Sequence, residues 1–415
     1  MISPAAGNCT SEPAPARLAP AAGFSTADVS AEGEPTIVTL GHSTRPTEPG
    51  GDAALTCVTG DRSARSLEQA ADAVDGRADR ALDLAAAIGR WLPSPGTGRT
   101  AERWRVLSTV AARDLTAARV VEAHTDALAI LAEAAADPDA RNDSEYSADH
   151  HDHMLLRGPG RHARTWGVFA AEGAGVRVDA RRVAGGWELT GTKPWCSLAG
   201  ELSNALITAH TGDGARRLFA VDLRGPGVHV AESGWVAKGL PEVVSGPIDL
   251  LGCPARPVGP DGWYLARPGF AWGGIGVAAC WFGGAVGVAR TLRDSLQESS
   301  ATREIDQIAQ MHLGGVDVAL TAARSVLDHA AVAVDRGRAR GADGALLAAR
   351  VRSLVARTCE EIIGRVGHCL GPAPLARDER HARRVADLEL YLRQHHAERD
   401  EAAVGRQVLK QPEWP

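Results

Sequence analysis

Three adjacent side chains, Trp195, Cys196 and Ser197, bring together an indole, a thiol and a hydroxyl. They end the stretch GWELTGTKPWCS, residues 186–197, in which apolar and polar residues alternate as in a half-buried strand. Gly191 is expected to make a turn within this stretch. Because a strand directs alternate side chains to opposite faces, Trp195 and Ser197 would share one face, suited to a flat heteroaromatic ligand. The alternative is that Trp195 is an ordinary core residue and Ser197 only begins a loop.

A second candidate group lies near the C-terminus, in RQHHAERD, residues 393–400. Imidazole titrates near neutral pH, so His395 or His396 could act as a general base. The alternative is that these residues form the solvated polar face of the last helix.

Two other polar runs predict less chemistry. The run DHHDH, Asp149–His153, has metal-ligand residue types but no second cluster at a fixed spacing, so we predict a surface loop and no metal site. The run ARDERHARR, residues 376–384, is expected to form an exposed helical face with i,i+4 ion pairs.

The elements that must position these residues change in type along the chain. The pattern is helical from about 65 to 137 and has a period of two from 164 to about 260, which predicts an antiparallel β unit. Helices return after Pro260. This order predicts an α+β fold. The predicted units are a disordered low-complexity segment (1–62), an N-terminal helical domain (63–157), a middle antiparallel β domain (158–262) and a C-terminal helical bundle (263–410).

Two apolar patterns belong to the C-terminal part. An apolar seam steps by three and four residues from Leu313 to Val334, as on one face of a packed helix. Residues 268–289 contain no charged side chain and match a bilayer span in length, yet seven of them are glycine. Small residues let neighbouring helices approach closely, so we predict a buried helix at the centre of the bundle.

The bulk composition excludes some classes of function. The chain has 415 residues, of which 44% are hydrophobic, and this is enough for two or three packed units. Its net charge is −6, which argues against binding to nucleic acids or membrane surfaces. Its seven cysteines are scattered and form no C-x-x-C pair, as in reduced proteins. We therefore expect a cytoplasmic protein with no nucleic-acid or membrane partner.

The strand motif and the order of the domains resemble the acyl-CoA dehydrogenase superfamily over residues 65–410. Those flavoproteins have an N-terminal helical domain, a middle β domain and a C-terminal four-helix bundle. The segment GTKPWCS is similar to the family's Gly-Thr-Lys-x-Trp-Ile-(Thr/Ser) strand, with Cys196 in place of the aliphatic residue. The resemblance implies that Trp195 lies against the ring of FAD, while the Ser197 hydroxyl and the local backbone address the ring edge.

Three further matches bear on the cofactor and the base. FAAEGAG is similar to the family's Thr-Glu-Pro-Gly segment and implies that Glu172 also binds the cofactor. The family's Arg-x-x-Phe-Gly element, whose arginine reaches a neighbouring subunit's flavin, is not visible in residues 295–306. The family's Tyr-Glu-Gly-Thr stretch aligns with residues 393–396 and puts Gln394 in the place of the glutamate base. An amide cannot act as a general base near neutral pH. A second family position for the base falls near Gly274, again without a carboxylate.

The resemblance implies a homo-oligomer, a dimer or tetramer, and leaves three functions open. The first is oxidation of the CH–CH bond of an acyl-CoA thioester, with electrons passed to an electron-transfer flavoprotein and His395 or His396 as the base. The second is a monooxygenase of the same fold that receives reduced flavin from a partner reductase. The third is a catalytically silent subunit that binds acyl-CoA.

Overall fold

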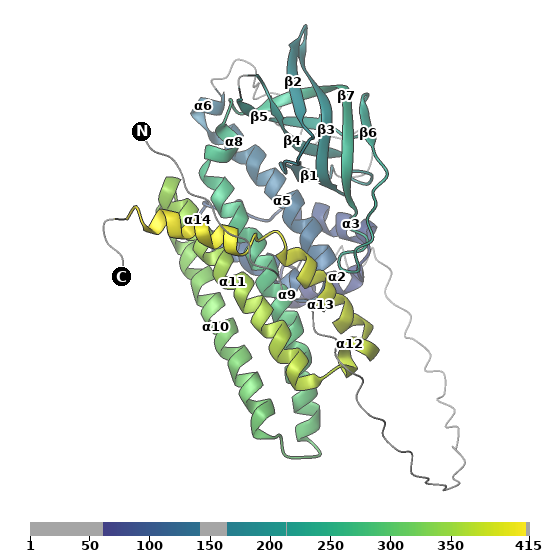
Figure 1. Cartoon of the computed structure of the whole chain (residues 1–415), viewed down its shortest axis with the longest axis vertical. Helices are drawn as coiled ribbons and strands as arrows, with labels where there is room; N and C mark the ends of the chain where they lie inside the picture. The colour runs from purple at the N-terminus through teal and green to yellow at the C-terminus, as the bar shows by residue number, and fades with distance from the viewer. Residues whose placement is uncertain (1–60, 142–163, 213, 412–415) are drawn as a thin grey trace, which may run out of the picture. The chain divides into compact units, whose positions relative to one another are not determined.

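A computed structural model describes residues 61–141, 164–212 and 214–411 of the chain (Figure 1). Most of the segment 1–62, predicted to be disordered, and the run Asp149–His153 lie outside the described residues. The helical pattern predicted from about 65 to 137 is confirmed. It comprises α2 (Ala64–Val74), α3 (Ala78–Gly89), α4 (Thr100–Ala111) and α5 (Leu115–Ala136), followed by the short α6 (Pro138–Arg141).

The strands lie where the period of two predicts them. They are β1 (Trp166–Phe169), β2 (Val178–Val183), β3 (Gly186–Ser197), β4 (Asn204–His210), β5 (Arg216–Asp222), β6 (Val228–Val230) and β7 (Ser245–Val258). Their pairings run β4-β2-β3-β7-β5 and return to β4, so the sheet closes on itself as a barrel, with β1 and β6 at its margins.

The sheet is mixed, and the prediction of a purely antiparallel β unit is wrong. β1 pairs with β4 in parallel, from Trp166 opposite Asn204 to Phe169 opposite Ile207. Along the chain, the antiparallel strands β2 and β3 come between β1 and β4. The chain reverses direction from β2 to β3 and again from β3 to β4, so β4 runs in the same direction as β1.

Gly191 does not make a turn, as the sequence predicted; it lies within the continuous strand β3. Its φ is 126°, and a Cβ there would lie 2.0 Å from the carbonyl oxygen of Arg177, the residue just before β2. Glycine is required at this position because the backbones of β2 and β3 approach closely and the conformation is left-handed.

Helices return after the sheet, as predicted. They are α8 (Trp263–Ala266), α9 (Pro268–Ser300), α10 (Gln307–Asp335), α11 (Gly341–Leu370), α12 (Ala373–Arg377), α13 (Glu379–Leu392) and α14 (Glu398–Val408). Figure 1 shows α9, α10 and α11 running side by side. The predicted seam of α10 is confirmed, because Val316, Ala323 and Leu327 along it are buried.

The uncharged run 268–289 forms the first two thirds of α9, which packs against α4, α5, α10, α11 and α13. Among the described residues, α9 is the helix long and apolar enough to cross a membrane, but 78% of its most apolar window is buried inside the protein. Its glycines permit this packing: a Cβ at Gly283 would lie 2.2 Å from the carbonyl oxygen of Ser108 on α4. The prediction of a central, buried helix is confirmed.

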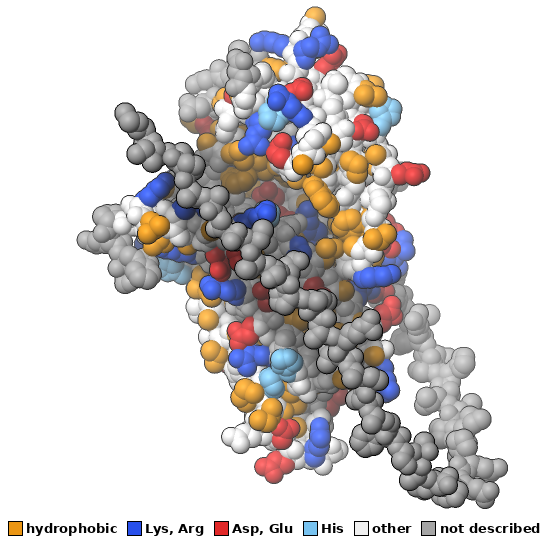
Figure 2. Space-filling model, viewed as in Figure 1, with side chains coloured by type: hydrophobic (Ala, Val, Ile, Leu, Met, Phe, Trp, Pro, Cys, Tyr) orange, Lys and Arg blue, Asp and Glu red, His pale blue; other side chains and the backbone are white. Residues whose placement is uncertain are grey.

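The basic run 376–384 differs from its prediction. It does not form an exposed face with pairs along its own helix, because Arg380 and Arg383 reach across to carboxylates near α2 and His381 is buried. Elsewhere, on the face shown in Figure 2, basic and acidic side chains are interspersed instead of gathered by sign.

One loop ties the sheet to the bundle. The backbone N–H of Leu240, between β6 and β7, donates to the Asp387 carboxylate of α13 at 2.5 Å. A Cβ at the preceding Gly239 would lie 2.1 Å from the carbonyl oxygen of Ala386. Burial of the Asp387 carboxyl raises its pKa to about 6.

Candidate functional site

Trp195 projects from a bulge in β3. The register against β7 shifts between Lys193 and Cys196, so that two residues of β3 stand opposite Pro247 alone. Trp195 has a φ of 59° and is 63% exposed. The alternative that it is a core residue is therefore wrong. A large aromatic side chain held at the surface in a strained, bulged conformation offers a face for a ligand.

Cys196 points away from that surface. Its side chain is buried, and the thiol donates to the carbonyl oxygen of Lys193 at 3.2 Å. Burial raises the pKa of the thiol to about 12, so it is neither a nucleophile nor an anion at neutral pH. Only the backbone of Cys196 can face a ligand.

Ser197 offers a hydrogen-bond acceptor. Its Oγ lies 2.7 Å from the Oγ of Ser245, and the Ser245 hydroxyl donates to the carbonyl oxygen of Val243 at 3.0 Å. Because the single hydrogen of Ser245 is used in that bond, Ser197 must donate to Ser245. The Ser197 oxygen then retains lone pairs for an N–H group of a ligand.

Glu172 is held by basic side chains of the sheet. Its carboxylate lies 3.0 Å from Lys193 Nζ, 3.4 Å from Arg216 and 3.6 Å from His210. Partial burial opposes ionisation, but the hydrogen bond and charge of Lys193 keep the pKa of Glu172 below its usual value. Lys193 is itself buried and also donates to Thr208 Oγ1 at 2.9 Å. Glu172 thus joins β3 through the residue two positions before Trp195.

The two histidines lie in the turn between α13 and α14, in different surroundings. His395 is buried, with Nε2 3.1 Å from Ser353 Oγ and 3.7 Å from Asp400. Burial lowers its pKa, which favours the neutral imidazole. The side chain of His396 is 67% exposed and its Nδ1 lies 3.3 Å from Asp400. Of the two histidines, His395 is therefore the better candidate for a general base, because its ring is oriented by a hydrogen bond and its neutral form is favoured.

Arg352 of α11 brings together the two positions at which the resemblance implies a base. Its guanidinium donates to the carbonyl oxygen of Gln394 at 2.9 Å and to that of Gly274 at 3.0 Å. Neither the turn 393–397 nor the segment 268–280 contains Asp or Glu. Both expected positions are adjacent, and both lack a carboxylate.

The charged residues of α5 were not predicted as site residues. Arg119, Glu122 and Asp126 are spaced three and four apart, which places them on one face of a helix otherwise rich in Ala, Val and Leu. Glu122 is buried, 3.0 Å from Arg119 and 3.3 Å from the hydroxyl of Tyr391 on α13. Burial raises its pKa to about 7. Charged residues that recur on one face of an otherwise apolar helix are the sequence pattern that could have indicated these buried charges.

Asp126 supplies a carboxylate where α9 begins. A Cβ at Gly273 would lie 2.8 Å from Asp126 Oδ1. The carboxylate is partly buried and forms no hydrogen bond or ion pair with any residue that the structure describes, and burial raises its pKa. A carboxylate from α5 therefore stands next to Gly273, the neighbour of Gly274.

These residues fit a flavin ring on the sheet side. The exposed indole of Trp195 offers a stacking surface, and Ser197 offers an acceptor two residues away on the same strand. The turn 393–397 and α5 form a second group across the bundle. No hydrogen bond or ion pair between described residues joins the β3 group to this second group.

The comparisons with known proteins agree with this arrangement. Residues 260–394 match the family model described as acyl-CoA dehydrogenase, C-terminal domain. The chain has the acyl-CoA dehydrogenase fold. No curated protein matches it.

Solved structures share this fold across nearly the whole chain. KijD3, in complex with FMN and a dTDP-linked amino-keto sugar, has a TM-score of 0.67 and 21% identity, covering 88% of this chain and 95% of that one. FMN-bound TdsC from Paenibacillus sp. A11-2 has a TM-score of 0.67 and 17% identity, covering 88% and 98%. The nitrososynthase from Micromonospora carbonacea var. africana has a TM-score of 0.69 and 16% identity, with the same coverage.

Proposed function

We propose that this protein is a flavin-dependent monooxygenase that uses reduced flavin from a separate reductase together with molecular oxygen. The observation that carries the proposal is the absence of a carboxylate at both adjacent base positions, in the turn 393–397 and in residues 268–280. Dehydrogenation of a thioester needs a base at the α carbon, whereas oxygen transfer from reduced flavin abstracts no α proton from a thioester. The solved structure of the dibenzothiophene monooxygenase TdsC supports it by likeness of fold.

The flavin we propose is FMN in place of the expected FAD. Structures of KijD3 and TdsC contain FMN. The connection from α9 to α10, with the sequence ATREID over residues 301–306, lacks the Arg-x-x-Phe-Gly element that the resemblance associates with a neighbour's flavin. Without that arginine, the phosphates and adenosine of FAD lose one source of binding energy.

Ser197 supports binding of the reduced form. Reduced flavin carries a hydrogen on N5, whereas oxidised flavin has an unprotonated N5 that accepts. Since Ser197 donates to Ser245, its free lone pairs match an N–H donor. We expect the protein to bind reduced FMN more tightly than oxidised FMN, and Ser197→Ala to remove that preference.

The charges on α5 support a small polar substrate. Asp126 is a carboxylate without a partner among the described residues, and the buried Glu122 and the partly buried Arg119 lie on the same helix face. Such groups accept hydrogen bonds from an amine or hydroxyl and penalise a purely aliphatic chain. We propose that His395, whose neutral form is favoured by burial and whose Nε2 lies 3.1 Å from Ser353 Oγ, takes a proton from the substrate.

An anaerobic experiment separates the candidate functions. The purified protein is loaded with oxidised FMN and mixed with butyryl-CoA or octanoyl-CoA while the flavin spectrum is followed. We expect no bleaching. In a separate aerobic assay we expect the protein to raise oxygen consumption only when a flavin reductase and NADH are supplied, above the rate of the reductase with free FMN alone. Bleaching by a thioester would overturn the proposal in favour of a dehydrogenase. A protein that binds neither oxidised nor reduced flavin would leave the silent acyl-CoA-binding subunit.

One observation favours acyl-CoA dehydrogenation as a second candidate. Asp126 brings a carboxylate from α5 to within contact of Gly273 on α9, where it would serve as the base. Electrons would then pass to an electron-transfer flavoprotein. Under this function Asp126→Asn abolishes bleaching by the thioester without releasing the flavin, whereas a variant that bleaches as fast as the wild type contradicts it.

A second copy of the chain is the partner that α10 supports. Four apolar side chains are exposed away from the buried seam of α10: Ile308, Met311, Val318 and Val332. Successive members are three, seven and fourteen residues apart. This is the spacing of an interhelical seam. We propose that copies associate through this face. Val318→Asp should lower the sedimentation coefficient to that of a monomer, and an unchanged assembly would refute the interface.

A further inference from the structure

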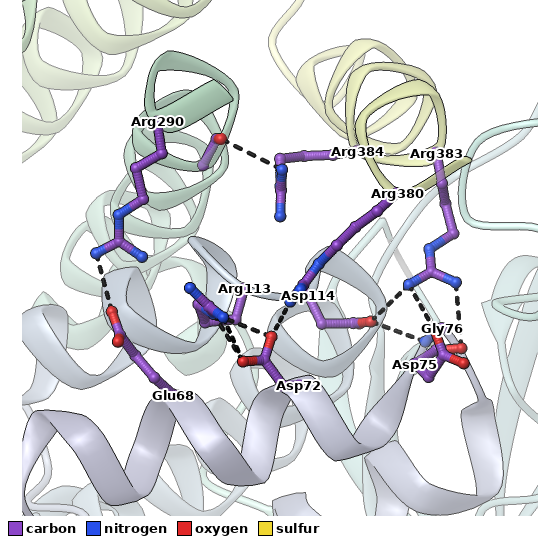
Figure 3. Close-up of polar contacts among 11 residues, drawn as sticks. Glu68, Asp72, Asp75, Gly76, Arg113, Asp114, Arg290, Arg380, Arg383 and Arg384 are labelled. Carbon is purple, nitrogen blue, oxygen red and sulfur yellow. Dashed lines mark hydrogen bonds and ion pairs between the residues drawn. The ribbon is translucent and has the colours of Figure 1, made fainter. Parts of the chain in front are cut away.

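The basic run at the start of α13 faces a cluster of carboxylates from α2 and the α4–α5 turn (Figure 3). Arg380 and Arg113 both pair with Asp72. Arg383 pairs with Asp75 at 3.1 Å and with Asp114 at 3.5 Å.

Arg290 of α9 stands at the other side of the cluster and pairs with Glu68 at 2.9 Å. Each arginine drawn around the centre of Figure 3 thus has a carboxylate, apart from Arg384.

Arg384 has no carboxylate within ion-pair distance among the described residues. Its guanidinium donates to the carbonyl oxygen of Gly287 at 3.3 Å, and its Nε is buried with no described hydrogen-bond partner. Burial, together with the like charges of Arg380, Arg113 and Arg290, lowers its pKa to about 10, although the charge of Asp378 acts in the opposite direction. A partly buried cation without an ion-pair partner is costly, and an anion would relieve that cost.

A cavity lies beside this guanidinium. Its volume is about 510 Å³, and its lining includes the cations Arg113, Arg290, Arg380 and Arg384. That volume is in the range that holds a small organic ligand.

Three acidic residues also line the cavity, but two of them bond other groups and the third is exposed. Asp378 accepts from the backbone N–H of His381 at 3.0 Å as the cap of α13. Asp294 pairs with Arg293 at 2.7 Å, and Glu298 is exposed near the end of α9. The end of the cavity near Arg384 is therefore the basic end.

We propose that this cavity binds a phosphoryl group and that Arg384 is its principal ligand. The planar guanidinium can donate two parallel hydrogen bonds to phosphate oxygens, and Arg290 and Arg380 add positive potential. The source is either inorganic phosphate or the phosphate of a small organic ester, and both share this chemistry. The site is separate from the flavin strand and does not depend on the redox function proposed above.

Calorimetric titration of the full-length protein tests the proposal. Inorganic phosphate and AMP are titrated separately at constant ionic strength, with chloride as the control anion. We expect binding of at least one of the two phosphates in the millimolar range or tighter. Tighter binding of AMP would identify a phosphate ester as the ligand class, and equal or weaker binding of AMP would identify free phosphate. No heat of binding for either compound overturns the proposal.

Two variants locate the site. Arg384→Gln should weaken binding by at least about tenfold, because a charge-assisted hydrogen bond is lost. Arg377→Gln is the matched control: it removes the same charge from an exposed residue of the same run that does not line the cavity, and should leave the affinity unchanged. Equal affinities for the two variants would refute the assignment. If Arg384→Gln does not fold, Arg384→Lys keeps the charge but loses the fork, and it should still weaken binding.

Discussion

Truncating Trp195 to alanine should separate ligand affinity from stability. The residue is 63% exposed in the free protein, so its removal uncovers little apolar surface and should change the free energy of unfolding by less than about 0.5 kcal/mol. If a flavin ring stacks on the indole, the lost stacking is about 1–3 kcal/mol. The dissociation constant for FMN should then rise by roughly 5- to 150-fold.

The backbone at this position gives a second, independent expectation. With a φ of 59°, any residue other than glycine bears a cost of about 1–2 kcal/mol. Trp195→Gly should therefore be more stable than Trp195→Ala by up to about 1 kcal/mol while binding FMN equally poorly.

The assay is a fluorescence titration with FMN, combined with urea unfolding of the flavin-free protein. Leu251→Ala is the matched control, since Leu251 is also 63% exposed and lies on the adjacent strand β7. The reasoning is refuted if Trp195→Ala keeps the wild-type affinity, or if it loses more than about 2 kcal/mol of stability, as a core residue would.

Three further predictions follow from the same structure. His395→Ala should abolish turnover with FMN still bound, whereas His396→Ala should leave the rate within a fewfold; steady-state oxygen uptake compares them. Because the pKa of Asp387 is raised from 3.8 to about 6, the folded state binds more protons between these values and stability falls by about 2–3 kcal/mol as pH rises through that window. Asp387→Asn should flatten this slope in urea unfolding at pH 4.5 and 7. Gly191→Ala should destabilise by more than about 3 kcal/mol in urea unfolding, and a normal midpoint would contradict the close approach to Arg177.

Periodicity predicts the helices and strands of this chain well because it follows from burial of one face. The seam of α10 carried that signal and was confirmed, and the buried helix over 268–289 was predicted from its lack of charge and its small residues. Direction of pairing is not encoded in the same way: nothing in residues 166–169 says that β1 pairs with β4 in parallel. Gly191 likewise has two readings, since glycine suits a turn and a close strand crossing equally.

The candidate site was predicted in part for a similar reason. Trp195 and Ser197 are neighbours in sequence, so one motif reveals them together. Asp126 and Gly273 meet only through the packing of α5 on α9, and the contact cannot be read from either segment alone. The charged run at 376–384 was misread because its partners, such as Asp72, lie some 300 residues earlier in the chain.

The short connection from Ser197 to α13 has a mechanical consequence. Ser197 is hydrogen-bonded to Ser245, and Ser245 is hydrogen-bonded to Val243. Leu240, three residues before Val243, is hydrogen-bonded to Asp387, which lies six residues before the turn that begins at residue 393. A span of six residues, 240–245, thus links the tryptophan strand to the helix that precedes the histidine turn. Inserting one residue into that span should change the distance between Trp195 and the turn 393–397 while the sheet and the bundle each stay folded.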